Sequence, residues 1–193
     1  ILHGSSASLV FSRGNVLGFL LSLLLLAPAY AFEPENALVE IEISRKEYDE
    51  RLPWISRSRQ AMKNGVVLAG RRILTTADGL AGHDISRVRK LGESRPYEAE
   101  VEWIDFYANV AVLSVPNVEF WSGLEPVILA PELPQSGDVE IFRWRSGRVE
   151  ARKAEIIRLS VGQSHTSHLH HLVLSVSSDM DGAGRSEIAI ADG

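Results

Sequence analysis

Beyond an apolar N-terminal segment, the hydrophobic residues of the chain alternate with polar ones or form short runs. Gly, Pro, Asn and Asp bound most of these runs, which is typical of strands joined by turns. Alternation is clearest over residues 39–43 and 99–103, where every second residue is apolar. Such a strand buries one face and exposes the other. The pattern predicts ten strands: residues 38–43, 65–69, 72–76, 85–90, 99–105, 110–114, 127–129, 139–144, 153–160 and 172–176.

Helices are nearly absent from this pattern. Only residues 45–62 form a stretch long enough for a helix, and Pro53 interrupts it. Dense strands without alternating helices favour an all-β barrel or sandwich over an α/β fold. Pro, Asn, Ser and Gly break the strand pattern over residues 116–126. We therefore predict a first β-barrel lobe over residues 37–115, a linker over 116–126 and an incomplete second lobe over 127–193.

The N-terminal segment has the three parts of an export signal. Arg13 supplies a positive charge, residues 16–26 are an 11-residue apolar run, and Ala29-Tyr30-Ala31 is an A-x-A cleavage site. The run is shorter than the roughly 20 residues that span a bilayer. We predict a signal peptide over residues 1–31, a periplasmic or secreted protein, and no stable membrane span after cleavage; an uncleaved anchor is the alternative.

The composition of the chain excludes several classes of partner and site. The net charge of −5 gives no basic surface for nucleic acid, so we expect no nucleic-acid partner. The absence of cysteine excludes disulfides, thiolate metal sites and a cysteine nucleophile. The chain begins at Ile1 instead of Met and ends at Asp192-Gly193, a dipeptide favoured in hairpin turns. We expect it to be a fragment of a longer protein.

Three segments follow one another in the order and spacing of protease motifs: I-L-T-T-A-D-G-L at 73–80, D-F-Y-A-N-V-A-V-L at 105–113, and D-G-A-G-R-S at 181–186. They resemble the I-L-T-x-x-H, D-x-x-x-D-[IV]-A-[VIL]-L and G-N-S-G-G motifs of HtrA/Deg trypsin-like proteases. G-V-V-L at 65–68 and G-D-V at 137–139 resemble flanking motifs of the same family. The resemblance covers residues 65–193 and implies a double β-barrel whose second barrel is truncated at its C-terminal end.

The resemblance also implies that the catalytic triad is degenerate. It places Asp78 at the histidine position, Asn109 at the aspartate position and Gly184 at the serine position. The chemistry needs a serine oxygen that attacks, a histidine that takes its proton and an aspartate that orients the histidine. A carboxylate is a weak base at neutral pH, an amide carries no charge, and glycine has no nucleophile. We therefore predict no catalytic residues and no protease activity.

Two neighbouring features of the third motif leave alternatives open. The family forms its oxyanion hole from backbone N–H groups at the serine and two residues before it, which the resemblance assigns to Gly184 and Gly182. A surviving carbonyl pocket and an ordinary glycine turn are both compatible with these glycines. Ser186 is an alternative nucleophile, but attack needs an approach of about 3–3.5 Å, and a shift of two residues re-aims the side chain.

Four histidines lie within seven residues: His165, His168, His170 and His171. Imidazole is a good ligand for Zn²⁺, Cu²⁺ or Ni²⁺. However, no carboxylate or cysteine is interleaved, and loop histidines without fixed hydrogen-bond partners are usually solvated. We expect neither a metal site nor any other cofactor. The alternative is a metal site in which these four histidines are the ligands.

Together these features predict an exported, catalytically inactive HtrA/Deg-like protein that binds a protein or peptide ligand and can form homo-oligomers. The family commonly carries PDZ domains after the protease domain, and these bind peptide C-termini by β-augmentation. One alternative is an active serine endopeptidase that uses Ser186, Asp78 or a histidine of the cluster. The other is an exported metal-binding β-domain.

Overall fold

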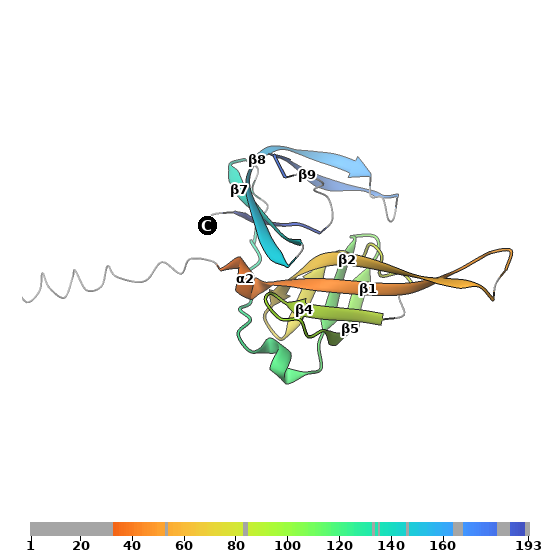
Figure 1. Ribbon diagram of the computed structural model, residues 1–193. Helices are drawn as coiled ribbons and strands as arrows, with labels where there is room; N and C mark the ends of the chain where they lie inside the picture. The colour runs from red at the N-terminus through yellow and green to blue at the C-terminus, as the bar shows by residue number, and fades with distance from the viewer. Residues whose placement is uncertain are drawn as a thin grey trace, which may run out of the picture. The chain divides into compact units, whose positions relative to one another are not determined.

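The computed structural model describes residues 33–52, 54–82, 85–132, 134, 136–145, 147–163, 168–180 and 186–191. A short helix, α2 (Pro34–Ala37), leads into a closed, six-stranded antiparallel barrel with strand order β1-β2-β3-β6-β5-β4. A four-stranded antiparallel sheet follows, with strand order β10-β7-β8-β9 (Figure 1). The predicted all-β fold class is therefore confirmed.

The barrel strands are β1 (Leu38–Tyr48), β2 (Ser56–Leu68), β3 (Arg72–Thr75), β4 (Ile85–Lys90), β5 (Tyr97–Asp105) and β6 (Val110–Ser114). A 3-10 helix, η1 (Val118–Trp121), comes after them. The strands of the second sheet are β7 (Asp138–Arg145), β8 (Arg148–Gln163), β9 (His170–Ser178) and β10 (Ile188–Ala191).

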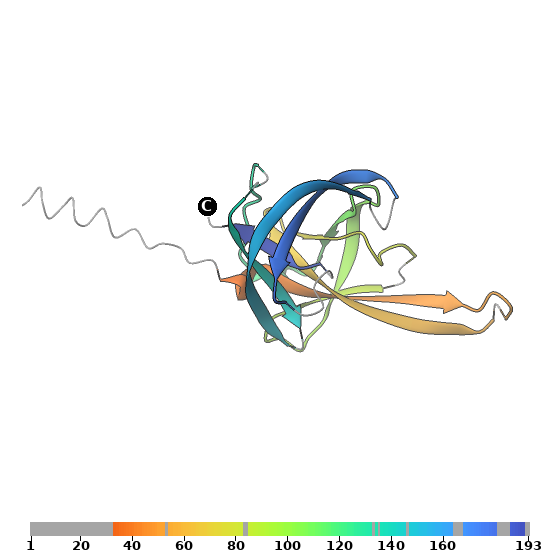
Figure 2. The same ribbon diagram turned by 90° about the horizontal axis from the view of Figure 1, so that it is seen from above.

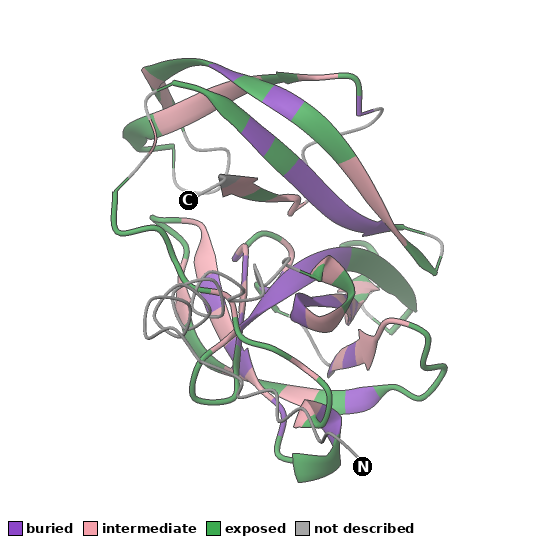
Figure 3. Ribbon diagram, turned by 90° about the vertical axis from the view of Figure 1, so that its left-hand side faces the viewer, coloured by how far each residue is buried: buried purple, intermediate pink, exposed green. Residues whose placement is uncertain are grey.

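The barrel core follows directly from the alternation in the sequence. In β1, Val39, Ile41 and Ile43 are buried, while Glu40 and Glu42 between them are half-buried and pair with Arg89 of β4. The η1 helix contributes aromatic side chains to the barrel core: Phe120 is fully buried and packs against Tyr97 and Trp121. Figure 3 shows buried residues in the barrel strands and in the strands of the second sheet.

The second sheet repeats part of the barrel's topology. In the barrel, β1 pairs with β2 on one side and with β4 on the other; in the sheet, β7 pairs in the same way with β8 and β10. Its own core consists of Val139, Ile141, Ala154, Ile156 and Met180. Toward the far ends of β8 and β9, the paired residues Val161 and Leu172 are exposed. Among the described residues, therefore, the second sheet is open.

The structure differs from the sequence pattern in two places. Residues 45–62 form no helix; β1 and β2 pair as an antiparallel hairpin from Leu38↔Val66 out to Tyr48↔Ser56. Residues 127–129 form no strand, since Val127 donates one backbone hydrogen bond to Val67 and Ile128 is 95% exposed. In the part of the chain that the structure describes, no helix has the length and hydropathy of a membrane span.

A buried side-chain hydrogen bond links the barrel to the second sheet. Asn64 of β2 accepts a hydrogen bond through Oδ1 from the backbone N–H of Trp144 of β7, at 2.8 Å. Replacement of Asn64 by Ala leaves this buried N–H without a partner, and we expect a loss of about 1–2 kcal/mol in the free energy of unfolding. Urea unfolding measures the loss. Asn36→Ala is the control, because it removes a half-buried asparagine that hydrogen-bonds to the exposed Glu33. Equal stability of the two variants would contradict the prediction.

Candidate functional site

The turns that carry Asp78 and Asn109 lie side by side. Asp78 follows β3 and Asn109 precedes β6, and these strands pair from Arg72↔Ser114 to Thr75↔Ala111. The Oδ1 atom of Asn109 accepts a hydrogen bond from the backbone N–H of Asp78 at 2.9 Å. Asn109 adopts the left-handed conformation, with φ at 55°, which asparagine tolerates better than most residues. Its side chain therefore holds the neighbouring turn and leaves the Asp78 carboxylate exposed.

A buried lysine supports the same turn from inside. The ammonium group of Lys63, on β2, donates hydrogen bonds to the backbone oxygen of Thr76 at 2.6 Å and to that of Asp78 at 2.5 Å. Only 8% of Lys63 is exposed. Burial lowers the pKa of Lys63 to about 8, and the Asp78 carboxylate opposes this shift without cancelling it. The role of Lys63 was not predicted from the sequence.

Ser186 is also near this turn. Its Oγ lies 2.9 Å from Oγ1 of Thr76, and its φ of 65° is in the left-handed region. This partner is a neutral hydroxyl, which is not a base. Residues 181–185, and with them Gly182 and Gly184, lie outside the described residues.

The histidines do not gather into a metal site among the described residues. His170 and His171 lie in β9 opposite Gln163 and Gly162, and both are exposed. His168 accepts a hydrogen bond through its backbone oxygen from Nε2 of Gln163, and His165 lies outside the described residues. Within the described part of the chain, no group of three or more His, Cys, Asp or Glu side chains could hold a metal ion.

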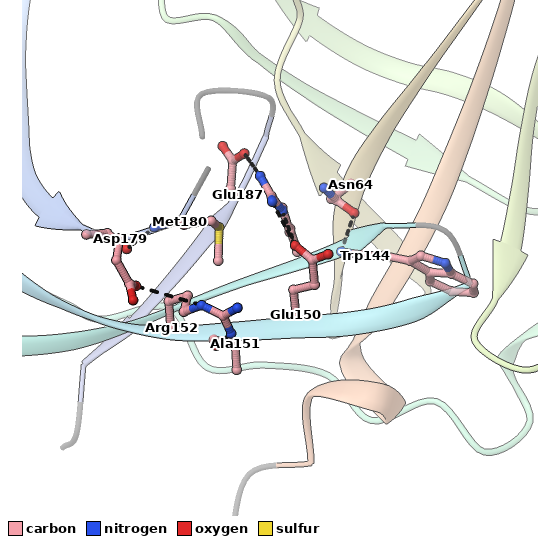
Figure 4. A network of polar contacts seen from close by, with 10 residues as sticks. Asn64, Trp144, Glu150, Ala151, Arg152, Asp179, Met180 and Glu187 are labelled. Carbon is pink, nitrogen blue, oxygen red and sulfur yellow. Dashed lines mark hydrogen bonds and ion pairs between the residues drawn. The ribbon is translucent and has the colours of Figure 1, made fainter. Parts of the chain in front are cut away.

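A buried cation anchors the residue that follows Ser186. Arg143 of β7 pairs with Glu150 of β8 at 2.7 Å, and its other terminal nitrogen lies 3.9 Å from Glu187 (Figure 4). The hydrogen bond from Arg143 lowers the pKa of Glu150. Glu187 thus lies within ion-pair distance of Arg143, directly before β10. The sequence pattern did not reveal that Arg143 is buried, because a charged residue inside an apolar strand has the same letter pattern as an exposed one.

Comparisons with known proteins point to one family. No protein-family model matches the chain. "Protease Do-like 4, mitochondrial" from Arabidopsis thaliana is 35% identical over 98 residues, which cover 49% of this chain and 18% of that protein. The chain spans between 18% and 59% of the length of the curated Do-like proteins that it matches.

Solved structures show the same fold. The active form of the Rv3671c protease of M. tuberculosis superposes with a TM-score of 0.60 at 19% identity, covering 98% of this chain and 78% of that one. Deg5 superposes with a TM-score of 0.57 at 13% identity, covering 81% and 74%. In sequence and in fold, the chain is therefore similar to the HtrA/Deg trypsin-like proteases. The resemblance to this family predicted from the sequence motifs is thereby confirmed.

The groups that the structure describes around Asp78 are linked by hydrogen bonds to backbone or hydroxyl groups. Asn109 accepts from a backbone N–H, and an amide oxygen cannot take up a proton at neutral pH. Lys63 uses its protons to donate to two carbonyl oxygens, so it acts here as a hydrogen-bond donor and not as a base. The Ser186 hydroxyl is paired with that of Thr76. This arrangement fits a structural role, in which the side chains hold a surface turn, better than a role in proton transfer.

The lowered pKa of Lys63 predicts how stability depends on pH. Between pH 8 and 10.5 the unfolded chain binds more protons at this lysine than the folded chain does. The free energy of unfolding therefore rises with pH across this window. Over this pH window, we expect the free energy of unfolding of the native chain to rise by on the order of 2 kcal/mol more than that of a Lys63→Met variant, with solvent screening taken into account. Urea unfolding at several pH values measures the gain. Lys153→Met, at an exposed position of β8, is the control, and parallel curves for native and Lys63→Met chains would refute the prediction.

Proposed function

We propose that this chain is a catalytically inactive HtrA/Deg relative whose altered site binds a protein or peptide ligand. The observation that carries the proposal is the hydrogen bond from the Asp78 backbone to the Asn109 side chain, backed by Lys63. This hydrogen bond gives Asp78 and Asn109, which stand at two of the triad positions, a role in stabilising the structure. They hold one turn in place, and neither is poised to move a proton.

The surface beside this turn has the character of a binding site. Phe106 and Tyr107 lie in the β5–β6 turn, separated from Asn109 by Ala108, and are 39% and 69% exposed. Asp105 holds the turn by accepting hydrogen bonds from the backbone N–H groups of Tyr107 and Ala108. Exposed aromatic side chains on a rigid turn, next to the Asp78 carboxylate, favour a ligand with both apolar and basic side chains.

Selection of peptides tests the binding proposal. The full chain, immobilised, is used to enrich a random peptide library, and the affinity of an enriched peptide is measured by calorimetry. We expect Tyr107→Ala to weaken binding about tenfold or more, because exposed aromatic residues dominate such interfaces. Tyr48→Ala, at another exposed tyrosine on β1, serves as the control. A library without enrichment, or binding indifferent to Tyr107 and Asp78, would remove the proposal.

We also propose that residues 1–31 direct export and are removed after Ala31. The support is the charge, apolar run and A-x-A site in the sequence. The N-terminus of the mature protein, determined by mass spectrometry after cell fractionation, tests this. Phe32 as the first residue of an exported protein is the expected result. A different first residue, in protein recovered from an organelle fraction, would overturn the proposal. The organelle fraction is included because the Do-like 4 relative is named as mitochondrial.

A further inference from the structure

The β1–β2 hairpin extends well beyond the barrel. β1 pairs with β4 only over residues 39–44, and β2 pairs with β3 only over residues 66–68. From Arg45 to Arg59 the hairpin pairs with no further strand among the described residues, and Figures 1 and 2 show it projecting away from the barrel. We call residues 44–60 the arm. Isolated two-stranded ribbons are marginally stable in water, so a surface that receives the arm would favour its extended form.

The described residues at the tip of the arm form a hydrogen-bonded, apolar turn. The Asp49 carboxylate accepts hydrogen bonds from the backbone N–H groups of Arg51 and Leu52, and the Ile55 N–H donates to the Leu52 backbone oxygen at 2.8 Å. This turn holds Leu52, Trp54 and Ile55 outward, with Trp54 77% exposed. Tyr48 is exposed at the base of the same turn. The tip therefore presents four large apolar side chains at one convex end of the molecule.

Basic residues outnumber acidic residues in the arm. The arm carries five basic and three acidic residues, in a chain whose net charge is −5. The acidic residues are partly engaged within the arm, since Glu47 pairs with Arg45 and Arg59, and Asp49 caps the turn. Arg51 and Arg57 flank the tip and are exposed. The arm is thus a local basic and apolar projection on an acidic protein.

We propose that the arm docks on a membrane surface that contains anionic lipids. A tryptophan with aliphatic neighbours is suited to the boundary between headgroups and acyl chains. Arginines just behind such a tip attract anionic headgroups, and neither signal alone gives firm binding. A convex tip favours insertion into a lipid layer over a flat contact between protein surfaces. The proposal is independent of the function proposed for the Asp78 turn.

Depth-dependent quenching tests the proposal with the full chain. Vesicles of brominated phosphatidylcholine and phosphatidylglycerol are added, and tryptophan fluorescence is recorded for the native chain, Trp54→Phe and Trp103→Phe. Bromine quenches only tryptophans within the lipid, so binding through residues 1–31 does not mimic the result. We expect quenching that Trp54→Phe abolishes and that Trp103→Phe, at an exposed position in the barrel, preserves. The double variant Arg51→Gln/Arg57→Gln should weaken vesicle binding about tenfold.

Two results would overturn the inference. The first is quenching that is absent, or that Trp54→Phe leaves unchanged. The second is a change in the sedimentation coefficient of a lipid-free Trp54→Ser variant, which would make the arm a contact between copies of the chain. Circular dichroism checks that the variants fold, and because the substituted residues are exposed we expect unchanged spectra.

Discussion

Replacement of Phe120 by Ala is expected to lower the free energy of unfolding by about 4 kcal/mol. Phe120 is fully buried, and its ring meets Tyr97 at 5.2 Å and Trp121 at 4.9 Å between centroids, both edge-on. The indole N–H of Trp121 donates to the Val115 backbone oxygen, so this cluster cannot easily collapse into the space left by the ring. Loss of the ring removes both the transfer energy and the aromatic contacts.

Urea unfolding followed by circular dichroism measures this effect. The matched control is Val118→Ala in the same short helix, because Val118 is exposed and its loss should cost less than about 0.5 kcal/mol. A loss below about 1 kcal/mol for Phe120→Ala would mean that η1 does not close the end of the barrel. The result would then contradict the described core.

Gly65→Ala is expected to destabilise the barrel by about 3 kcal/mol, although it adds a single methyl group. A Cβ at this position would lie 2.6 Å from Cγ2 of Ile73 and 2.8 Å from Cδ1 of Ile41. Both isoleucines are fully buried, so neither can move away without displacing other core residues. The glycine of the G-V-V-L segment is therefore required by close packing between β1, β2 and β3.

Gly162→Ala provides the control for this prediction. A Cβ there would also come close to a side chain, at 2.7 Å from Cγ2 of Val173. Val173 is only half-buried in β9, so it can rotate toward solvent, and we expect a cost below about 1 kcal/mol. Thermal unfolding of both variants separates the two cases. Equal melting temperatures would show that the barrel interior is looser than described.

The strands that the sequence predicted best are those with a buried and an exposed face. Residues 85–90 and 110–114 have the predicted bounds, and residues 38–43 begin β1 as expected. The arm escaped prediction because almost all of β2 before Lys63 is exposed, so no apolar period marks it. Residues 127–129 are apolar but hydrogen-bond to the barrel at one point only. The predicted division into lobes at residues 116–126 stays a prediction.

The site was predictable in part. The family resemblance directed attention to Asp78 and Asn109, and the structure brings their turns into hydrogen-bond contact. Lys63 and Arg143 gave no signal, because their importance comes from burial, and burial of a charged side chain depends on partners distant in sequence. Lys63 donates to a backbone oxygen 15 residues away in the sequence, and Arg143 of β7 approaches Glu187, which directly precedes the neighbouring strand β10.

The measurement that tests the central proposal most directly is labelling of the full chain with a fluorophosphonate probe. The probe reacts with an activated serine, which requires a base and an oriented nucleophile together. An active HtrA/Deg protease serves as the positive control, and heat-denatured chain sets the background. We predict labelling no higher than this background. Labelling of the native chain that Ser186→Ala abolishes would contradict the account and establish an active endopeptidase with a displaced nucleophile.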